Sequence, residues 1–322
     1  MTKNLIWRNS YIVTTGGALN TISGTHFNNQ GGTGYDIYYD TAVGSGAVAL
    51  EVSSDNQLGI RKYGLGTLVL TNSANTMGDS TVINAGTLEI GGAGRLQSGS
   101  YSYSITNSGA FSYNSTANQT LSGVISGAGA LTKSNSSTLT LSGNNTYSGT
   151  TTISAGTIEI GAAGRLGAGS YAQNISNNGT LIYSGTNDQT LSGILSGTGA
   201  LTKNAASTLT LSGDNTYSGA TTINAGTLEI GNGLTAGSLN AASAITVNGA
   251  LAFNRSDDIT QGTHFSTAAI GGTGSIVQNG SGTLTLNAAN TYSGGTTLNT
   301  GTLVIGNTAA AGTGTITQTD AT

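Results

Sequence analysis

The chain has 322 residues, of which 52 are glycine and none is proline or cysteine, and only 7% are charged. So little charge argues against a helical or α/β globule, which carries about 25% charged residues, and the absence of cysteine excludes a disulfide-stapled scaffold. With a net charge of −4 and no basic stripe, the chain is not expected to bind nucleic acid, and no apolar run approaches the ~18 residues of a membrane-inserted helix.

Residues 1–58 differ in composition from the rest of the chain. They contain Trp7, the sole tryptophan, and an aromatic cluster at Tyr35, Tyr38 and Tyr39. SGTHFNNQGGTG at 23–34 resembles QGTHFSTAAIGGTG at 261–274, so we interpret 1–58 as a degenerate first unit that caps the following repeats or docks them to a partner, because exposed end coils must be blunted. The start of the chain lacks the apolar core of a secretory signal. We therefore expect either that a signal was removed or that the protein leaves its cell by another route, such as release with a virus particle.

One short motif in this segment matches a calcium-binding pattern. GGTGYDIYY at 31–39 fits the nonapeptide G-G-x-G-x-D-x-U-x, with Tyr38 as the bulky residue and Asp36 as the acid. That motif must recur in tandem to complete an oxygen shell, and the counterpart GGTGSIVQN at 271–279 has Ser275 and Ile276 where Tyr35 and Asp36 stand. A glycine-rich corner is therefore the favoured interpretation, and no calcium or other cofactor is predicted.

From residue 59 onward one sequence string recurs. NTMGDSTVINAGTLEIG begins at Asn75, NTYSGTTTISAGTIEIG at Asn145, NTYSGATTINAGTLEIG at Asn215 and NTYSGGTTLNTGTLVIG at Asn290. The first two intervals are equal and the third is slightly longer. A period of this kind indicates a solenoid, in which each unit buries its apolar face by stacking on its neighbours. We assign 59–322 to a repeat β-solenoid shaft.

Within each unit the pattern is that of short strands. STLTLSG at 137–143, TTTISAG at 150–156, GTIEIG at 156–161 and GTLIYSG at 179–185 alternate apolar with polar residues and end in Gly, Asn or Ser. The runs are too close together for intervening helices. The sequence thus predicts an all-β chain of about 14 short coils, three coils of ~23 residues per repeat, stacked at ~4.8 Å. Apolar residues would point inward, Thr outward, and Asn would form side-chain ladders between coils.

The string LTKSNSSTLTLSGNNTYSGTTTISAGTIEIG at 131–161, with its partner copies, resembles the passenger-associated transport repeats of bacterial autotransporters. The resemblance covers about residues 60–310. It implies a right-handed parallel β-helix exposed on the cell surface and associated with export rather than with a reaction. A signal peptide and a C-terminal membrane barrel, which complete an autotransporter, are not recognised here.

The residues that carry chemistry favour structural roles. Glu89, Glu159 and Glu229 share one repeat position near Arg95 and Arg165 and are too far apart along the stack for the paired carboxylates of a glycosidase, which lie ~5 to 9.5 Å apart. His26 and His264 occupy equivalent THF strings without further ligands, so no metal is predicted. Arg255, Asp257 and Asp258 lie in the longer unit before Asn290, where a solvated loop is favoured over a pocket. We predict no catalytic, cofactor-binding or metal-binding residue.

These observations favour a non-enzymatic, surface-exposed β-solenoid stalk or adhesin-like structural protein at the bacterial cell surface. Its expected partners are surface glycans or other proteins, with self-assembly or virion docking through 1–58 as a further expectation and no membrane insertion. Two alternatives stay open: a phage fibre, spike or capsid-decoration protein, and a glycan-binding or glycan-cleaving β-helix. Fold analogy with β-helical enzymes does not decide between these classes.

Overall fold

Parallel β-strands, stacked turn upon turn, form most of the part of the chain that the structure describes. The computed structural model describes the backbone of residues 12–14, 19–22, 37–41, 48–52, 58–62, 65–71, 73 and 78–319, and side chains from residue 60 onward within those ranges. The strands stack as a β-solenoid of about 13 turns, close to the predicted number of coils. The chain divides into two compact units, Met1–Thr152 and Ile153–Thr322.

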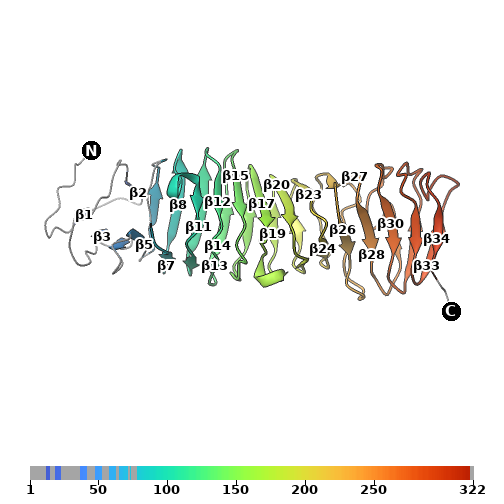
Figure 1. The fold of residues 1–322 in the computed structure, drawn as a ribbon, viewed down its shortest axis with the longest axis horizontal. Helices are drawn as coiled ribbons and strands as arrows, with labels where there is room; N and C mark the ends of the chain where they lie inside the picture. Colours follow the sequence, from blue (N-terminus) through green and yellow to red (C-terminus); the bar gives the residue numbers. More distant parts are fainter. Residues whose placement is uncertain are drawn as a thin grey trace. The chain divides into compact units, whose positions relative to one another are not determined.

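In the described part of unit 1, the strands form three sheets and lie side by side, one turn beside the next (Figure 1). The first holds β1 (Ile12–Thr14), β3 (Ile37–Thr41), β4 (Val48–Val52), β5 (Leu58–Lys62), β7 (Thr81–Ile83), β10 (Ile105–Asn107) and β13 (Ile125–Ser126). The second holds β2 (Leu19–Ile22), β6 (Thr67–Leu70), β8 (Thr87–Gly92), β11 (Ala110–Ser115) and β14 (Ala130–Lys133), and the third β9 (Ser100–Tyr101), β12 (Gln119–Leu121) and β15 (Thr138–Leu141). A 3₁₀ turn, η1 (Gln97–Gly99), precedes β9.

Pairing is parallel in unit 1 except at its N-terminal end. There β4 pairs antiparallel with both β3 and β5, whereas β5 pairs parallel with β7. The side chains of Trp7, Tyr35, Tyr38 and Tyr39 lie outside the described residues, as do the Asp36 calcium motif and His26. The assignment of 1–58 as a cap or docking segment stays a prediction.

Unit 2 has the same construction. Its sheets contain β19 (Ile175–Asn177) and β22 (Leu195–Ser196); β17 (Thr157–Ala162), β20 (Thr180–Gly185), β23 (Ala200–Lys203), β25 (Thr221–Ile223) and β27 (Ile245–Val247); and β29 (Ile259–Thr260), β31 (Thr283–Leu286) and β33 (Thr302–Ile305). The longest sheet holds β18 (Ser170–Tyr171), β21 (Gln189–Leu191), β24 (Thr208–Leu211), β26 (Thr227–Ile230), β28 (Ala250–Phe253), β30 (Ser275–Gln278), β32 (Thr296–Leu298) and β34 (Ile316–Gln318). β16 (Thr151–Ile153) spans the division, and η2 (Gly167–Gly169) precedes β18. The helical elements of the described part, η1 and η2, have three residues each and are far too short to cross a membrane.

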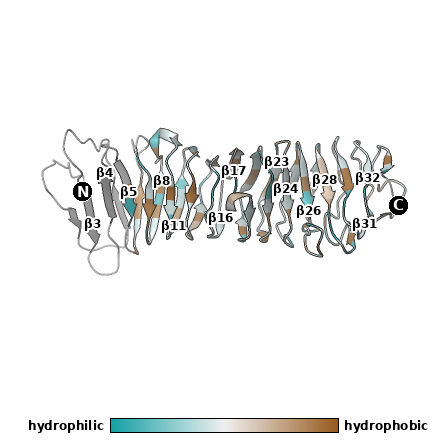
Figure 2. Cartoon of the chain, turned by 60° about the horizontal axis from the view of Figure 1, so that its bottom comes forward, coloured by the Kyte–Doolittle hydropathy of each residue, from teal (hydrophilic) through white to brown (hydrophobic). Residues whose placement is uncertain are grey.

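The alternation predicted from the sequence is confirmed, because buried and half-exposed residues alternate along β15, β20 and β24. Figure 2 shows apolar and polar residues interleaved along single strands. In unit 2 one inward row runs Ile160, Tyr183, Lys203, Ile223 and Val247 through successive turns. The predicted Asn ladders are also present, since Asn224 Nδ2 donates to Asn204 Oδ1 at 2.8 Å and Asn299 Nδ2 to Asn279 Oδ1 at 2.7 Å.

One repeat is longer than the three whole turns that the sequence predicted. Register in unit 2 runs through four turns from Ser170 to Ala252, by way of Thr190, Thr210 and Glu229. One repeat therefore advances by three turns and about one third, and the equivalent strands β17, β26 and β33 accordingly lie in three different sheets. The prediction of ~23 residues per coil was wrong because most turns lack an extra loop and are shorter, as between Thr208 and Thr227.

The recurrent NTYSG string makes a corner between strands. Asn215 Oδ1 accepts a hydrogen bond from the backbone N–H of Leu195 at 2.9 Å, and its Nδ2 donates to the Gly213 carbonyl at 2.7 Å. Tyr217 is completely buried, and its hydroxyl lies 2.6 Å from Thr221 Oγ1. A side chain thus satisfies backbone groups where the strand ladder is interrupted, as buried polar groups require. Asn145 and Asn290 accept in the same way from the preceding turn.

Candidate functional site

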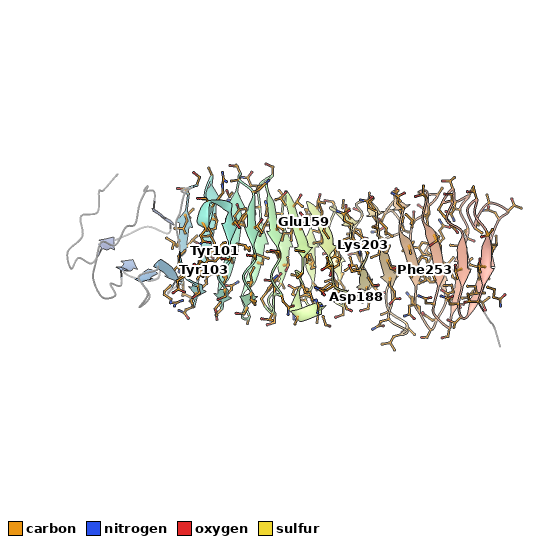
Figure 3. All side chains as sticks on the ribbon, in the orientation of Figure 1. Tyr101, Tyr103, Glu159, Asp188, Lys203 and Phe253 are labelled. Carbon is orange, nitrogen blue, oxygen red and sulfur yellow. The ribbon has the colours of Figure 1, made fainter. Side chains whose placement is uncertain are left out.

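The repeated glutamates do not form a catalytic pair. In unit 2, Glu159 lies on β17 and Glu229 on β26, which belong to different sheets, so their carboxylates face different sides of the stack (Figure 3 labels Glu159). In unit 1, Glu89 Oε1 accepts a hydrogen bond from Asn114 Nδ2 at 3.1 Å. Two carboxyl groups within ~5 to 9.5 Å, the arrangement that glycoside hydrolysis needs, are therefore not supplied by this repeat position.

The arginine of the longer unit is not part of a solvated loop. Arg255 is only 5% exposed, and its guanidinium makes a two-bond pair with Asp257, Nε to Oδ1 and Nη2 to Oδ2, both at 2.8 Å. Its Nη1 donates to the Gly237 carbonyl, also at 2.8 Å. The hydrogen bonds that Arg255 donates to Asp257 lower the pKa of the Asp257 carboxyl. The expectation of a solvated loop was wrong for Arg255, because the loop at 231–237 folds over it and the Gly237 carbonyl accepts a hydrogen bond from its guanidinium.

Asp258 and His264 also have backbone partners. Asp258 Oδ1 accepts from the N–H of Thr283 in the next turn at 3.2 Å. His264 Nδ1 accepts from the Thr260 N–H at 3.0 Å, and the His264 carbonyl accepts from Leu239. Among the residues whose positions are described, no three His, Cys, Asp or Glu side chains gather into a group able to hold a metal ion. Both residues close turns in this arrangement.

Buried lysines are the repeated feature that the sequence interpretation missed. Lys62, Lys133 and Lys203 are 0–1% exposed. Each ends a strand on the inward side, and in the sheets of Lys133 and Lys203 a tyrosine precedes it by one turn, Tyr113 and Tyr183 respectively. The ammonium of Lys133 lies 5.7 Å from the Tyr113 ring centre and that of Lys203 5.6 Å from the Tyr183 ring centre, within cation–π range.

Backbone carbonyls bind these ammonium groups. Lys133 Nζ donates to the carbonyls of Ser134 at 2.5 Å and Asn135 at 2.8 Å. Lys203 Nζ donates to the Ala205 carbonyl and, at 3.4 Å, to the Ala225 carbonyl of the next turn. Burial lowers the pKa of all three lysines, Lys62, Lys133 and Lys203, to about 8. Desolvation disfavours the charged amine, and the carbonyls offset only part of that cost.

The fourth repeat has glutamine at this position. Gln278 follows Phe253 in the inward row, and its Nε2 donates to the carbonyls of Gly280 and Gly282, both at 2.9 Å. A neutral side-chain donor in the fourth repeat thus binds the backbone carbonyls that follow its strand, as the lysine ammonium does in the other repeats. The signal was available in the sequence, because in ALTK the lysine has the same strand parity as the buried leucine. These residues hold turns together and are shielded from any ligand, so we assign them to the scaffold.

Because these buried residues belong to the scaffold, the surface that is open to a ligand is the outer face of the sheets. In unit 2, β23, β25 and β27 carry ALTKN at 200–204, ATTIN at 220–224 and AITVN at 244–248. Register places Thr202 beside Thr222 and Thr222 beside Thr246. The three Thr and the Asn residues that follow them two positions later are half-exposed or exposed. We call this array of three Ala, three Thr and three Asn the ATN lattice.

The fold and its surfaces define a parallel β-solenoid protein whose repeats build a scaffold. Four segments, 60–90, 131–160, 201–230 and 276–305, match the family of the passenger-associated transport repeat. The chain therefore carries four of these repeats, as the resemblance predicted. It is also 40% identical over 179 residues to a protein described as "Adhesin BmaC autotransporter" from Brucella suis biovar 1 (strain 1330). The match covers 50% of this chain and 5% of that relative. No solved structure matches the chain significantly.

Proposed function

We propose that this chain is a surface-exposed structural segment of an autotransporter-type adhesin, placed outside the bacterial cell and without catalytic activity. The observation that carries the proposal is the set of four passenger-associated transport repeats folded as stacked parallel β-turns. The adhesin relative supports the same function, although the chain spans only 5% of its length. Neither finding favours a phage particle or a glycan-cleaving enzyme.

The bonding of the stacked turns supports a mechanical role. Each strand inside a sheet pairs on both edges, so the backbone donors and acceptors of one turn are satisfied by its two neighbours. Apolar inward rows and buried corner tyrosines fill the interior. In a repeat protein of this kind, stability is the sum of the turns and their nearest-neighbour interfaces. Such a stack resists protease and presents its sheet faces to partners, which we expect to be glycans or proteins of another surface.

Localisation and adhesion are tested together. An antibody raised against the purified chain is applied to intact and to lysed cells of the source bacterium. The proposal expects labelling of intact cells, and it expects beads coated with the chain to adhere to a target surface. Labelling confined to lysed cells contradicts it. Turnover of any polysaccharide by the purified protein, lost in the Asp257→Ala or Asp258→Ala variant, contradicts the non-enzymatic part.

A further inference from the structure

The ATN lattice is a regular, uncharged surface of unit 2. Its rows run along the stack of turns: Ala200, Ala220 and Ala244; Thr202, Thr222 and Thr246; Asn204, Asn224 and Asn248. Neighbouring members of a row are ~4.8 Å apart, and neighbouring rows are ~6.8 Å apart, because outward residues are two positions apart on a strand. The only lysine within these strands, Lys203, points inward and is buried.

The hydrogen-bonding groups of the lattice are not used up within the fold. None of the Thr202, Thr222 and Thr246 hydroxyls has a hydrogen-bond partner among the described residues. Asn224 donates one N–H to Asn204, and Asn204 donates one to Ser184 at 3.3 Å. An amide carries two N–H donors and a carbonyl with two lone pairs, so each of these side chains keeps capacity for a ligand. The Asn-to-Asn bond also fixes the amide orientation, which lowers the entropic cost of binding.

We propose that the ATN lattice binds an uncharged, extended polysaccharide chain that lies along the stack of turns; this rests on the proposed adhesin function and names the partner of that surface. An extended glycan presents a hydroxyl-bearing ring at each residue, with a rise similar to the strand spacing, so successive rings meet successive Thr and Asn side chains. The Ala row leaves a flat margin beside these polar rows. The lattice carries no charge, which favours a neutral glycan over an acidic peptide or a phosphate-bearing polymer.

Many weak and equivalent contacts carry this binding, because the lattice has no aromatic ring on which a sugar could stack. Binding should therefore strengthen from a monosaccharide to about a trisaccharide, since each added residue meets a further one of the strands β23, β25 and β27. A monosaccharide should bind much more weakly than a polymer of the same linkage.

The test is electrophoresis of the purified full chain in native gels cast with neutral polysaccharides: hydroxyethyl cellulose and galactomannan, which have extended β-linked backbones, and pullulan as a flexible α-linked comparison. The perturbing variant is Thr222→Lys, which puts a long charged side chain at the centre of the lattice. Its matched control is Thr210→Lys on β24, a half-exposed Thr on a different sheet of the same unit. Circular dichroism confirms that both variants keep the β-spectrum, and mobilities are normalised to gels without polysaccharide.

We expect at least one β-linked polymer to retard the wild type, Thr222→Lys to weaken that retardation at least tenfold, and Thr210→Lys to leave it unchanged. Equal loss in both variants, or no retardation by any polymer, overturns the inference. A change of oligomeric state in Thr222→Lys without any glycan effect overturns it too, in favour of self-association. If cells still display the chain and beads still adhere while these gels show nothing, the inference fails and the proposed adhesin function stands.

Discussion

Replacing Lys203 by Gln should change how the stability of the protein depends on pH. Lys203 is buried, and burial lowers its pKa from 10.5 to about 8, with Asp188 acting weakly in the opposite direction. In the unfolded chain the amine keeps its ordinary pKa. Between pH 8 and 10.5 the unfolded state therefore binds more protons than the folded state, and the stability of the wild type rises with pH in this window. Below pH 8 the amine is charged in both states and the full cost of burying it is present.

The size of the effect follows from the same two pKa values. From pH 7 to pH 10, one such lysine contributes a rise of about 2 kcal/mol in the free energy of unfolding, at about 1.36 kcal/mol per pKa unit and with some discount for residual solvation. Gln is a fitting replacement because Gln278 closes the equivalent turn in the fourth repeat with two carbonyl hydrogen bonds. Tyr183 in the same row has its pKa raised to about 12 by burial, so it does not titrate in this range.

The assay is urea unfolding followed by far-ultraviolet circular dichroism at pH 7, 8, 9 and 10. The wild type should gain about 2 kcal/mol more between the ends of this series than Lys203→Gln does. The reciprocal variant Gln278→Lys is the control, and it should gain a slope of the same sign. Parallel pH profiles for the wild type and Lys203→Gln would show that the amine is solvated in the folded state, and the argument from burial would be refuted.

Three further predictions concern the corners and loops. Arg255→Ala should cost about 1.5 kcal/mol, because it leaves the buried Gly237 carbonyl without its donor, whereas water can solvate the Asp257 carboxylate, whose side chain is 42% exposed; a loss below ~0.5 kcal/mol in urea unfolding would contradict this. Tyr217→Phe should cost about 1 kcal/mol, the net value of its buried hydroxyl bond, measured as a shift in melting temperature. Gly193→Ala should destabilise unit 2 strongly, since its Cβ would lie 2.2 Å from a backbone carbonyl of the preceding turn, whereas Gly271→Ala, with a nearest side-chain atom at 3.2 Å, should be tolerated; equal thermal stability of the two glycine variants would disprove the steric argument.

The sequence predicted the architecture because its signals are local and repeated. Alternation in STLTLSG and GTLIYSG fixes which residues point inward, and the regular recurrence of the same string requires stacking. The length of a turn was harder to predict, since short turns, such as that from Thr208 to Thr227, and long turns, such as that from Ala250 to Ser275, both occur. Their difference lies in loops whose length carries no strand signal. The mean turn length, and with it the rotation of each repeat, emerged only from the register.

The candidate surface was less predictable, for a physical reason. By residue type alone, the lysines of ALTK would be expected at the surface. Their position two residues after a buried leucine places them inside the solenoid, where backbone carbonyls accept hydrogen bonds from their ammonium groups. Arg255 was misjudged likewise, because the residues that cover it at 231–237 come from an earlier loop of the chain. Polar groups buried by partners distant in sequence cannot be recognised from composition alone.

The advance of one third of a turn per repeat determines where surface features recur. Because β17, β26 and β33 lie in three sheets of unit 2, a residue that recurs once in every repeat lies on a new face each time. The additional residues of the last full unit do not disturb this order, since they lengthen loops and leave the succession of sheets intact. A patch on one face is therefore composed of strands with different offsets in the repeat. The ATN lattice shows this, because β23 and β25 belong to one copy and β27 to the longer unit that follows. Repetition builds the solenoid, and the combination of unlike strands on one face gives that face its specific chemistry.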